Sequence, residues 1–152
     1  MSVIAGWQTR RLDEMGEIIS GSTPSTSISS FWNGDIVWIT PYDLSRLKSP
    51  YLVDSSKKIT AAGLAGTSTH LLPAKSLVMS SRAPIGYLAL PAVNFCTNQG
   101  CKSFKLNPEI NPVFAYYNVS FNMHKIKNLG EGTTFAEISK TALANVEMDF
   151  PE

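Results

Sequence analysis

The sequence has few of the residues that build metal centres and activated nucleophiles. Its two cysteines, Cys96 and Cys101, lie five positions apart, which fits neither a Cys-x-x-Cys pair nor a zinc pattern. Its two histidines, His70 and His124, are far apart, with no Cys, Asp or Glu at metal-ligand spacing. We therefore expect no metal site and two reduced, partly buried thiols.

Motifs for nucleotide binding and for hydrolysis are also missing. The sequence contains no GxGxxG, no GxxxxGK(S/T) and no GxSxG. It also lacks the Asn/Asp-Pro-Pro-Tyr/Phe motif of amino methylation. These absences argue against a doubly wound nucleotide-binding fold, a serine hydrolase and a complete methyltransferase, so no cofactor is expected.

Long apolar runs are missing as well. Residues 1–12 lack the apolar core of a signal peptide. No stretch approaches the roughly 18 consecutive apolar residues that a membrane-spanning helix needs. From these two observations we expect a cytoplasmic protein with no membrane partner.

Charge is scarce and nearly balanced. Thirteen basic and 12 acidic residues give a formal net charge of +1, and charged residues make up 16% of the chain. A free-standing basic DNA-binding domain carries a larger excess of Lys and Arg. Three interpretations stay open: nucleic-acid binding is confined to one region, a partner supplies most phosphate contacts, or the target is not nucleic acid.

Apolar and turn-forming residues are plentiful. A hydrophobic content of 43%, with 10 glycines and 9 prolines in 152 residues, predicts one domain with a real core and many short elements. The irregular spacing of the helices predicts a mixed α/β (α+β) domain with a curved, largely antiparallel sheet and a few helices. Runs of β-branched, aromatic and other apolar residues predict strands at 17–20, 36–40, 71–73, 77–80, 85–90, 101–106 and 146–150.

Cap and turn signals place the remaining elements. Thr60 and Ser139 are expected to cap short helices at 61–64 and 140–145, and Asn111 to begin the longest helix, which ends near residue 130. The Asn-Gly pair at 33–34 predicts a turn, and an irregular or short helical excursion is expected over residues 43–56. One face of the longest helix is predicted to carry Val113, Tyr116, Tyr117, Ser120 and His124.

The most informative stretch runs from residue 80 to residue 100, where one cation stands among small donors and acceptors. The planar fork of Arg82 suits a phosphate or the O6 and N7 atoms of guanine, and it suits structural bonds to loop carbonyls equally well. Asn98 and Gln99 can contact adenine in a bidentate manner, but their spacing favours a turn whose amides satisfy backbone groups.

Two further loops offer hydroxyls and exposed backbone. Residues 130–135 contain Thr133 and Thr134, and Lys140 follows them closely. Backbone N–H groups, hydroxyls and a lysine in such a loop suit phosphate contacts. The loop at 21–24 contains Ser22 and Thr23 beside a glycine, which permits close approach of the backbone, although an ordinary surface loop is the simpler interpretation.

Six segments in order along the chain carry a resemblance to a known family. They are IISGSTP at 18–24, FWNGDIVWIT at 31–40, LLP at 71–73, SSRAPIGY at 80–87, TNQG at 97–100 and TTFAEISK at 133–140. In these segments the chain resembles a target recognition domain of the specificity subunit of type I restriction–modification systems. The segments span nearly the whole chain.

The resemblance implies a function in DNA recognition without catalysis. A specificity subunit of this kind has two recognition domains, each reading one half of a split double-stranded site, separated by long coiled-coil helices. Those helices dock modification subunits, which methylate adenine with S-adenosylmethionine, and a motor–nuclease subunit joins for cleavage. Residues 1–152 are expected to be a single recognition domain, with the second domain and the spacer helices absent, and self-association is a further expectation.

The resemblance also divides the candidate contacts into two groups. Positions shared by members with different targets cannot encode the target, so they fit backbone positioning or loop scaffolding: Ser22, Thr23, Ser81, Arg82, Thr133, Thr134 and Lys140. Base reading is expected mainly between the shared segments, with Asn98 and Gln99 as further candidates: Tyr42, Asp43, Arg46, Lys48, His70, Asn98 and Gln99.

Two rival interpretations differ in class. The near-neutral charge suits a protein-interaction fragment that binds modification or specificity subunits without binding DNA on its own. An enzyme, such as a hydrolase or a methyltransferase fragment, has no nucleophile–base motif to support it.

Overall fold

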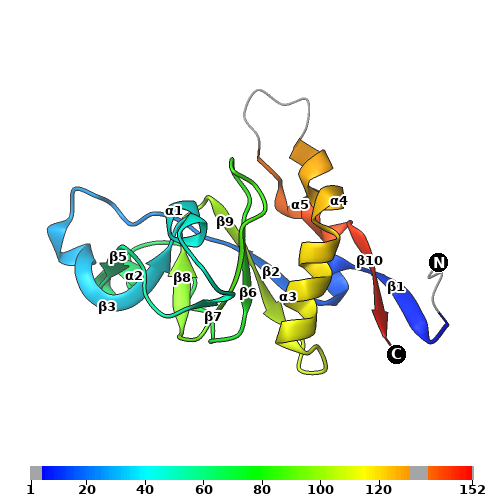
Figure 1. Cartoon of the computed structure of the whole chain (residues 1–152). Coiled ribbons are helices and arrows are strands. Elements are labelled where there is room, and N and C mark those ends of the chain that lie inside the picture. Colours follow the sequence, from blue (N-terminus) through cyan, green and yellow to red (C-terminus); the bar gives the residue numbers. More distant parts are fainter. Residues whose placement is uncertain (1–4, 131–136, 152) are drawn as a thin grey trace.

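The strands form three sheets along the length of the molecule (Figure 1). The structure is a computed structural model that describes residues 5–130 and 137–151. The central sheet has five strands in the order β2-β9-β6-β7-β4. Their bounds are β2 Gly16–Ser20, β4 Tyr51–Leu52, β6 Leu77–Ser80, β7 Leu88–Pro91 and β9 Cys101–Leu106. Within this sheet only the β4–β7 pair is parallel among the described strands.

Two smaller sheets lie at opposite ends of the molecule (Figure 1). One has the order β5-β3-β8, formed by β3 Trp32–Ile39, β5 Lys57–Ile59 and β8 Phe95–Thr97. The other is the antiparallel pair of β1 Trp7–Arg11 and β10 Glu147–Pro151. The first and last strands that the structure describes therefore lie side by side, far from the three-stranded sheet.

Short helices complete the fold. They are α1 Pro41–Ser45, α2 Ala61–Ala65, α3 Pro112–Phe121, α4 Met123–Lys127 and α5 Lys140–Ala144, with 3-10 turns η1 Leu12–Glu14, η2 Ser29–Phe31 and η3 Asn128–Gly130. Helices α3, α4 and α5 cover one face of the central sheet (Figure 1). No helix in the described part of the chain combines the length and apolar character needed to cross a membrane.

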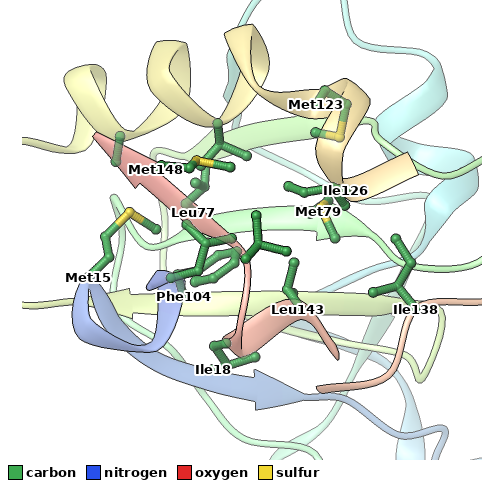
Figure 2. Close-up of a cluster of buried hydrophobic side chains, with 14 of the residues drawn as sticks. Met15, Ile18, Leu77, Met79, Phe104, Met123, Ile126, Ile138, Leu143 and Met148 are labelled. Atoms are coloured by element: carbon green, nitrogen blue, oxygen red, sulfur yellow. The ribbon is translucent and has the colours of Figure 1, made fainter. Parts of the chain in front are cut away.

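The central sheet is buried on both faces because its side chains alternate between two clusters. Leu77, Met79 and Phe104 point toward α3, α4 and α5 and are fully buried there (Figure 2). Val78 and Cys101 lie on the opposite face of the same strands, where they pack in a second cluster with residues of β3, β8 and α1. Alternation with period two is the ordinary consequence of the pleated strand. This two-sided core fixes the loops at the strand ends, where the candidate contacts lie.

Several sequence predictions are confirmed. The mixed α/β class, dominated by antiparallel pairs, is as expected, although the strands divide among three sheets. Thr60, Asn111 and Ser139 each cap a helix by accepting a hydrogen bond of 3.1 Å from the backbone N–H three residues later. The expected strands at 17–20, 77–80 and 101–106 coincide closely with β2, β6 and β9.

The predicted Asn-Gly turn is wrong. Asn33 and Gly34 lie inside β3, and Asn33 adopts a positive φ of 63°. Both Trp32 and Ile36 are registered with Ile59, so the pairing with β5 shifts at this point. The left-handed residue therefore lies at an irregularity within one strand and not in a turn between two strands.

The predicted long helix is interrupted, and its buried face lies elsewhere. α3 ends at Phe121, and a short α4 follows Asn122. The buried positions are Ala115, Val119, Met123 and Ile126, whereas Tyr117 and Phe121 are 60% and 82% exposed. The face predicted from the sequence therefore differs from the face that packs on the central sheet.

Other boundaries also differ. β1 and β8 were not expected, residues 71–73 contribute only an isolated bridge between Leu72 and Phe95, and β7 begins at Leu88, later than predicted. Both β1 and β8 depend on partners distant in sequence: β1 pairs with β10, and β8 runs parallel to β3. Such pairings leave little local signal.

Candidate nucleic-acid interface

Two polar loops that are far apart in sequence meet at one end of β8. The Ser22 N–H donates to the Thr97 carbonyl at 3.1 Å, and the Thr23 hydroxyl donates to the Gln99 side-chain oxygen at 2.5 Å. The Thr69 hydroxyl donates to the same Thr97 carbonyl at 2.8 Å. Thr23 and Gln99 are exposed. The expected backbone-contact loop and the expected base-reading turn therefore form one polar surface.

Asn98 supports the turn that presents this surface. Its side-chain oxygen accepts a hydrogen bond from the Gly100 N–H at 2.9 Å, and its own N–H donates to the Ile39 carbonyl at 3.0 Å. This is the geometry of the turn that the sequence favoured, in which the amide satisfies backbone groups. Gln99, the next residue, is the exposed side chain of the pair.

Helix α1 and its C-cap residue, Arg46, hold two exposed candidates and one buried one. Tyr42 is 56% exposed, and the Arg46 guanidinium lies over its ring at 5.4 Å from the centroid. Asp43 is 8% exposed and accepts hydrogen bonds from Thr40 and from the Ser56 N–H, which completes a capping box. An aromatic ring and a guanidinium on one surface suit contact with bases, whereas the Asp43 carboxylate is used inside the protein.

Lys48 lies in a separate open pocket of about 470 Å³. This pocket is bordered by Pro50 on the same loop, by Tyr87, and by Tyr117 on α3. Lys48 is exposed, whereas Arg46 and Tyr42 line a different pocket of about 320 Å³. The loop after α1 therefore presents its two cations to different hollows of the surface.

Arg82 pairs with a carboxylate from a distant segment of the chain. Its Nε donates to a Glu137 carboxylate oxygen at 3.2 Å, and the backbones of the same two residues form an antiparallel bridge. The Ile138 N–H donates to the Ser81 carbonyl at 2.8 Å, which extends this bridge. Both charged side chains are nearly half exposed, so the pair alone contributes little to stability. Its effect is to place the segment at 137–140 against the end of β6.

Lys140 and His70 come together although 70 residues separate them. Both line a pocket of about 270 Å³ with Glu17, Ser20 and Gly21. An expected phosphate contact and an expected base reader therefore share one hollow. The other two expected phosphate contacts, Thr133 and Thr134, lie outside the described residues.

Sequence reasoning missed Lys102 on β9. This side chain is 6% exposed, and its pKa is lowered, mainly by burial. The fields of Glu137, Arg82, Cys101 and Lys140 also act on it, those of Glu137 and Cys101 raising the pKa and those of Arg82 and Lys140 lowering it. The available signal was a lysine within a strand whose neighbours are Cys101, Ser103 and Phe104.

Thiol and metal chemistry find no support in the part of the chain that the structure describes. Cys96 and Cys101 are free and buried, and burial raises the pKa of Cys96 to about 11 and that of Cys101 further. At neutral pH both remain protonated, and a thiol is a poor nucleophile. No group of three or more metal-ligating side chains occurs among the described residues.

Comparisons with known proteins agree on one family. The model of the type I restriction modification DNA specificity domain matches residues 4–152. The chain is 33% identical over 147 residues to the type I restriction enzyme MjaIX specificity subunit of Methanocaldococcus jannaschii, covering 95% of this chain and 34% of that protein. It is 26% identical to the HindI specificity subunit of Haemophilus influenzae, covering 96% and 32%.

Solved structures share the fold. The HsdS subunit from Thermoanaerobacter tengcongensis superposes with a TM-score of 0.71 at 18% identity, covering 99% of this chain and 34% of that one. The type I S subunit from M. genitalium gives 0.65 at 19% identity, covering 99% and 36%. The chain spans about a third of the length of these relatives. Because the family model matches nearly its whole length, the chain belongs to the type I restriction modification DNA specificity domain family.

Proposed function

We propose that this chain is a target recognition domain that reads one half of a split double-stranded DNA site for a type I restriction–modification complex. The observation that carries the proposal is the family match over residues 4–152. The names of the relatives, which are specificity subunits, support it. The surface described above also supports the proposal, because it brings together hydroxyls, amides and cations from loops that are distant in sequence.

The proposal assigns the chemistry to partner subunits. The domain binds DNA without catalysis and without a cofactor, while a modification subunit methylates and a motor–nuclease subunit cleaves. A chain that spans about a third of its relatives corresponds in size to one recognition unit of a two-domain subunit. Such a complex acts on cellular DNA, so the proposal places the domain in the cytoplasm.

The proposed contacts follow the two groups expected from the sequence. Phosphate positioning is assigned to Ser22, Thr23, Ser81, Arg82, Thr133, Thr134 and Lys140. Base reading is assigned to the exposed side chains of Tyr42, Arg46, Lys48, His70 and Gln99, with Asn98 shaping the turn. Asp43 is assigned to holding α1 in place and not to base reading, because its carboxylate is buried.

Selection from a randomised duplex library at two salt concentrations tests the proposal. The expected result is an enriched motif of a few base pairs whose yield falls as salt rises, because phosphate contacts release counterions. The same selection is run with the modification subunit added. If neither selection enriches a motif, while the chain still binds the modification subunit, the protein-interaction alternative replaces DNA reading.

Replacing Arg46 by alanine is expected to relax the selected motif at one position. A good base contact discriminates by about 1–3 kcal/mol, so the preference at that position should fall by roughly fivefold or more. Lys48→Ala should relax a different position, since Lys48 and Arg46 line separate pockets. Lys105→Ala, which changes an exposed lysine on β9, is the control. A uniform loss of affinity across all sequences would instead assign Arg46 to the phosphate backbone.

A further inference from the structure

Lys102 carries a charge in the middle of the central sheet. It lies opposite Ser20 on β2 and Met79 on β6, and its side chain is 6% exposed. Buried lysines are rare unless they are paired. No hydrogen bond or ion pair to the Lys102 amine occurs among residues 5–130 and 137–151. The residue is not fully enclosed, since 6% of its surface stays exposed.

A second unpartnered polar group lies on the same face of the sheet. The Ser81 N–H donates to the Gly100 carbonyl at 2.9 Å, which places Ser81 opposite Gly100, two residues from Lys102. Side chains two residues apart on a strand share a face, so Ser81 and Lys102 are diagonal neighbours. The Ser81 hydroxyl is completely buried and has no hydrogen-bond partner within the described chain. Two donors without acceptors therefore meet at the end of β6.

The charges around this point are unbalanced. Arg82 and Lys140 act on Lys102 as like charges, and Glu137 is the carboxylate whose field opposes them. Glu137 is already bonded to Arg82 at 3.2 Å. Among the described residues whose fields act on Lys102, the cations Arg82 and Lys140, together with Lys102 itself, outnumber the carboxylate of Glu137, and this excess of positive charge attracts an anion. The side chain of Ile138 anchors the segment that carries Glu137 and Lys140 in the core (Figure 2).

We propose that Lys102, Ser81, Arg82 and Lys140 form a binding site for a phosphate group of the DNA backbone. The choice of DNA as the source of the phosphate rests on the proposed function. Ammonium, guanidinium and hydroxyl groups all donate to a phosphate, whose oxygens accept several hydrogen bonds at once. Glu137 holds Arg82 at the edge of the site in the free protein. The partly buried amine of Lys102 gains most from the ligand because its charge has the fewest other partners.

The first experiment uses inorganic phosphate as the probe and amide NMR spectra as the readout. Saturable shifts are expected at residues 81–82, 102 and 137–140 of the wild type and are expected to disappear in Lys102→Met, which keeps the apolar stem. Lys105→Met, on the same strand but the opposite face, should behave as the wild type. Shifts that persist in Lys102→Met, or the lack of any saturable shift in the wild type, would overturn the site.

The second experiment measures duplex binding as a function of salt. Lys102→Met is expected to weaken binding about tenfold and equally for the selected and for a scrambled duplex, because a phosphate contact carries no sequence information. The slope of log affinity against log salt should fall by roughly 0.9 for one lost contact. A loss confined to the selected duplex, or no loss at all, would overturn the assignment.

Glu137→Gln supplies a test in the opposite direction. Removing the carboxylate that pairs with Arg82, while the amide preserves its shape, should tighten duplex binding several-fold at low salt. A purely structural Glu137 would instead leave the affinity unchanged or lower it. If the library selection finds no motif but duplex binding still depends on Lys102, the phosphate site stands and the sequence-reading proposal fails.

Discussion

Replacing Gly21 by alanine is expected to destabilise the domain by about 3 kcal/mol. A β-carbon at this position would collide with the carbonyl oxygen and the hydroxyl of Thr97 and with the carbonyl oxygen of Asn98. Two of these atoms belong to the backbone, and Thr97 is fixed by its parallel pairing with Ile39. A flexible side chain could move aside, but a paired backbone cannot. The alanine must therefore push the loop at 21–24 away from the turn at 97–100.

The same change should damage DNA binding, because it separates two parts of the candidate interface. The Ser22 N–H bond to Thr97 and the Thr23 bond to Gln99 both cross this point. Urea denaturation measures the stability, and the selected duplex measures the affinity. Gly6→Ala is the reference for backbone strain alone, because its φ is +79° and no atom lies within 4 Å of the added carbon. If Gly21→Ala cost no more than Gly6→Ala, the loop would have adjusted and the close approach at Gly21 would be unimportant.

Local chemistry in this sequence predicted local structure well. Thr60, Asn111 and Ser139 were recognisable as caps because a cap needs only a side-chain oxygen and a backbone N–H three residues later. The buried strands were recognisable from their apolar composition. The Asn-Gly pair at 33–34 was predicted to form a turn, but it lies inside β3, because the flanking Trp32 and Ile36 are both registered with Ile59.

Features that depend on distant partners could not be predicted in this way. Arg82 finds Glu137 across 55 residues, and β8 pairs in parallel with β3 across a similar separation. The buried Asp43 carboxylate accepts a hydrogen bond from the N–H of Ser56, 13 residues further along the chain. The position of Lys102 follows from its register between β2 and β6. In each case the residue types were visible, but their partners were set by the packing of the sheets.

These differences change how the candidate contacts should be understood. The turn at Asn98, the cap at Asp43 and the bridge at Arg82 all use polar groups to hold loops in place. Exposed side chains next to them, such as Tyr42, are then free to vary without loss of the scaffold. A recognition domain benefits from this division, because different targets can be read from the same framework.

Replacing Asp43 by alanine is expected to test that division directly, with a loss of about 3 kcal/mol in the free energy of unfolding. The Asp43 carboxylate accepts bonds from the Thr40 N–H at 2.9 Å, the Thr40 hydroxyl at 3.1 Å and the Ser56 N–H at 2.8 Å. Alanine leaves two backbone donors unsatisfied near the core, each at a cost of about 1–3 kcal/mol, and removes half of the capping box. Urea denaturation gives the measurement.

Two further variants separate the charge of Asp43 from its shape. Asp54→Ala removes an exposed carboxylate that pairs with Lys58 at 3.1 Å, and it should leave stability nearly unchanged. Asp43→Asn keeps the volume but turns an amide N–H toward a backbone or hydroxyl donor, so it should lie between the wild type and Asp43→Ala. If Asp43→Asn were as stable as the wild type, the capping argument would be wrong.

DNA selection with Asp43→Ala then distinguishes a cap from a base reader. Tyr42 lies on α1 and Arg46 is its C-cap residue, so loss of the capping box that Asp43 completes should blur the selected motif at every position that these two residues read. A direct base reader would behave differently: its removal would relax one position and leave stability almost intact. Measuring stability and selectivity on the same variant therefore decides whether the buried carboxylate recognises DNA or holds the side chains that do.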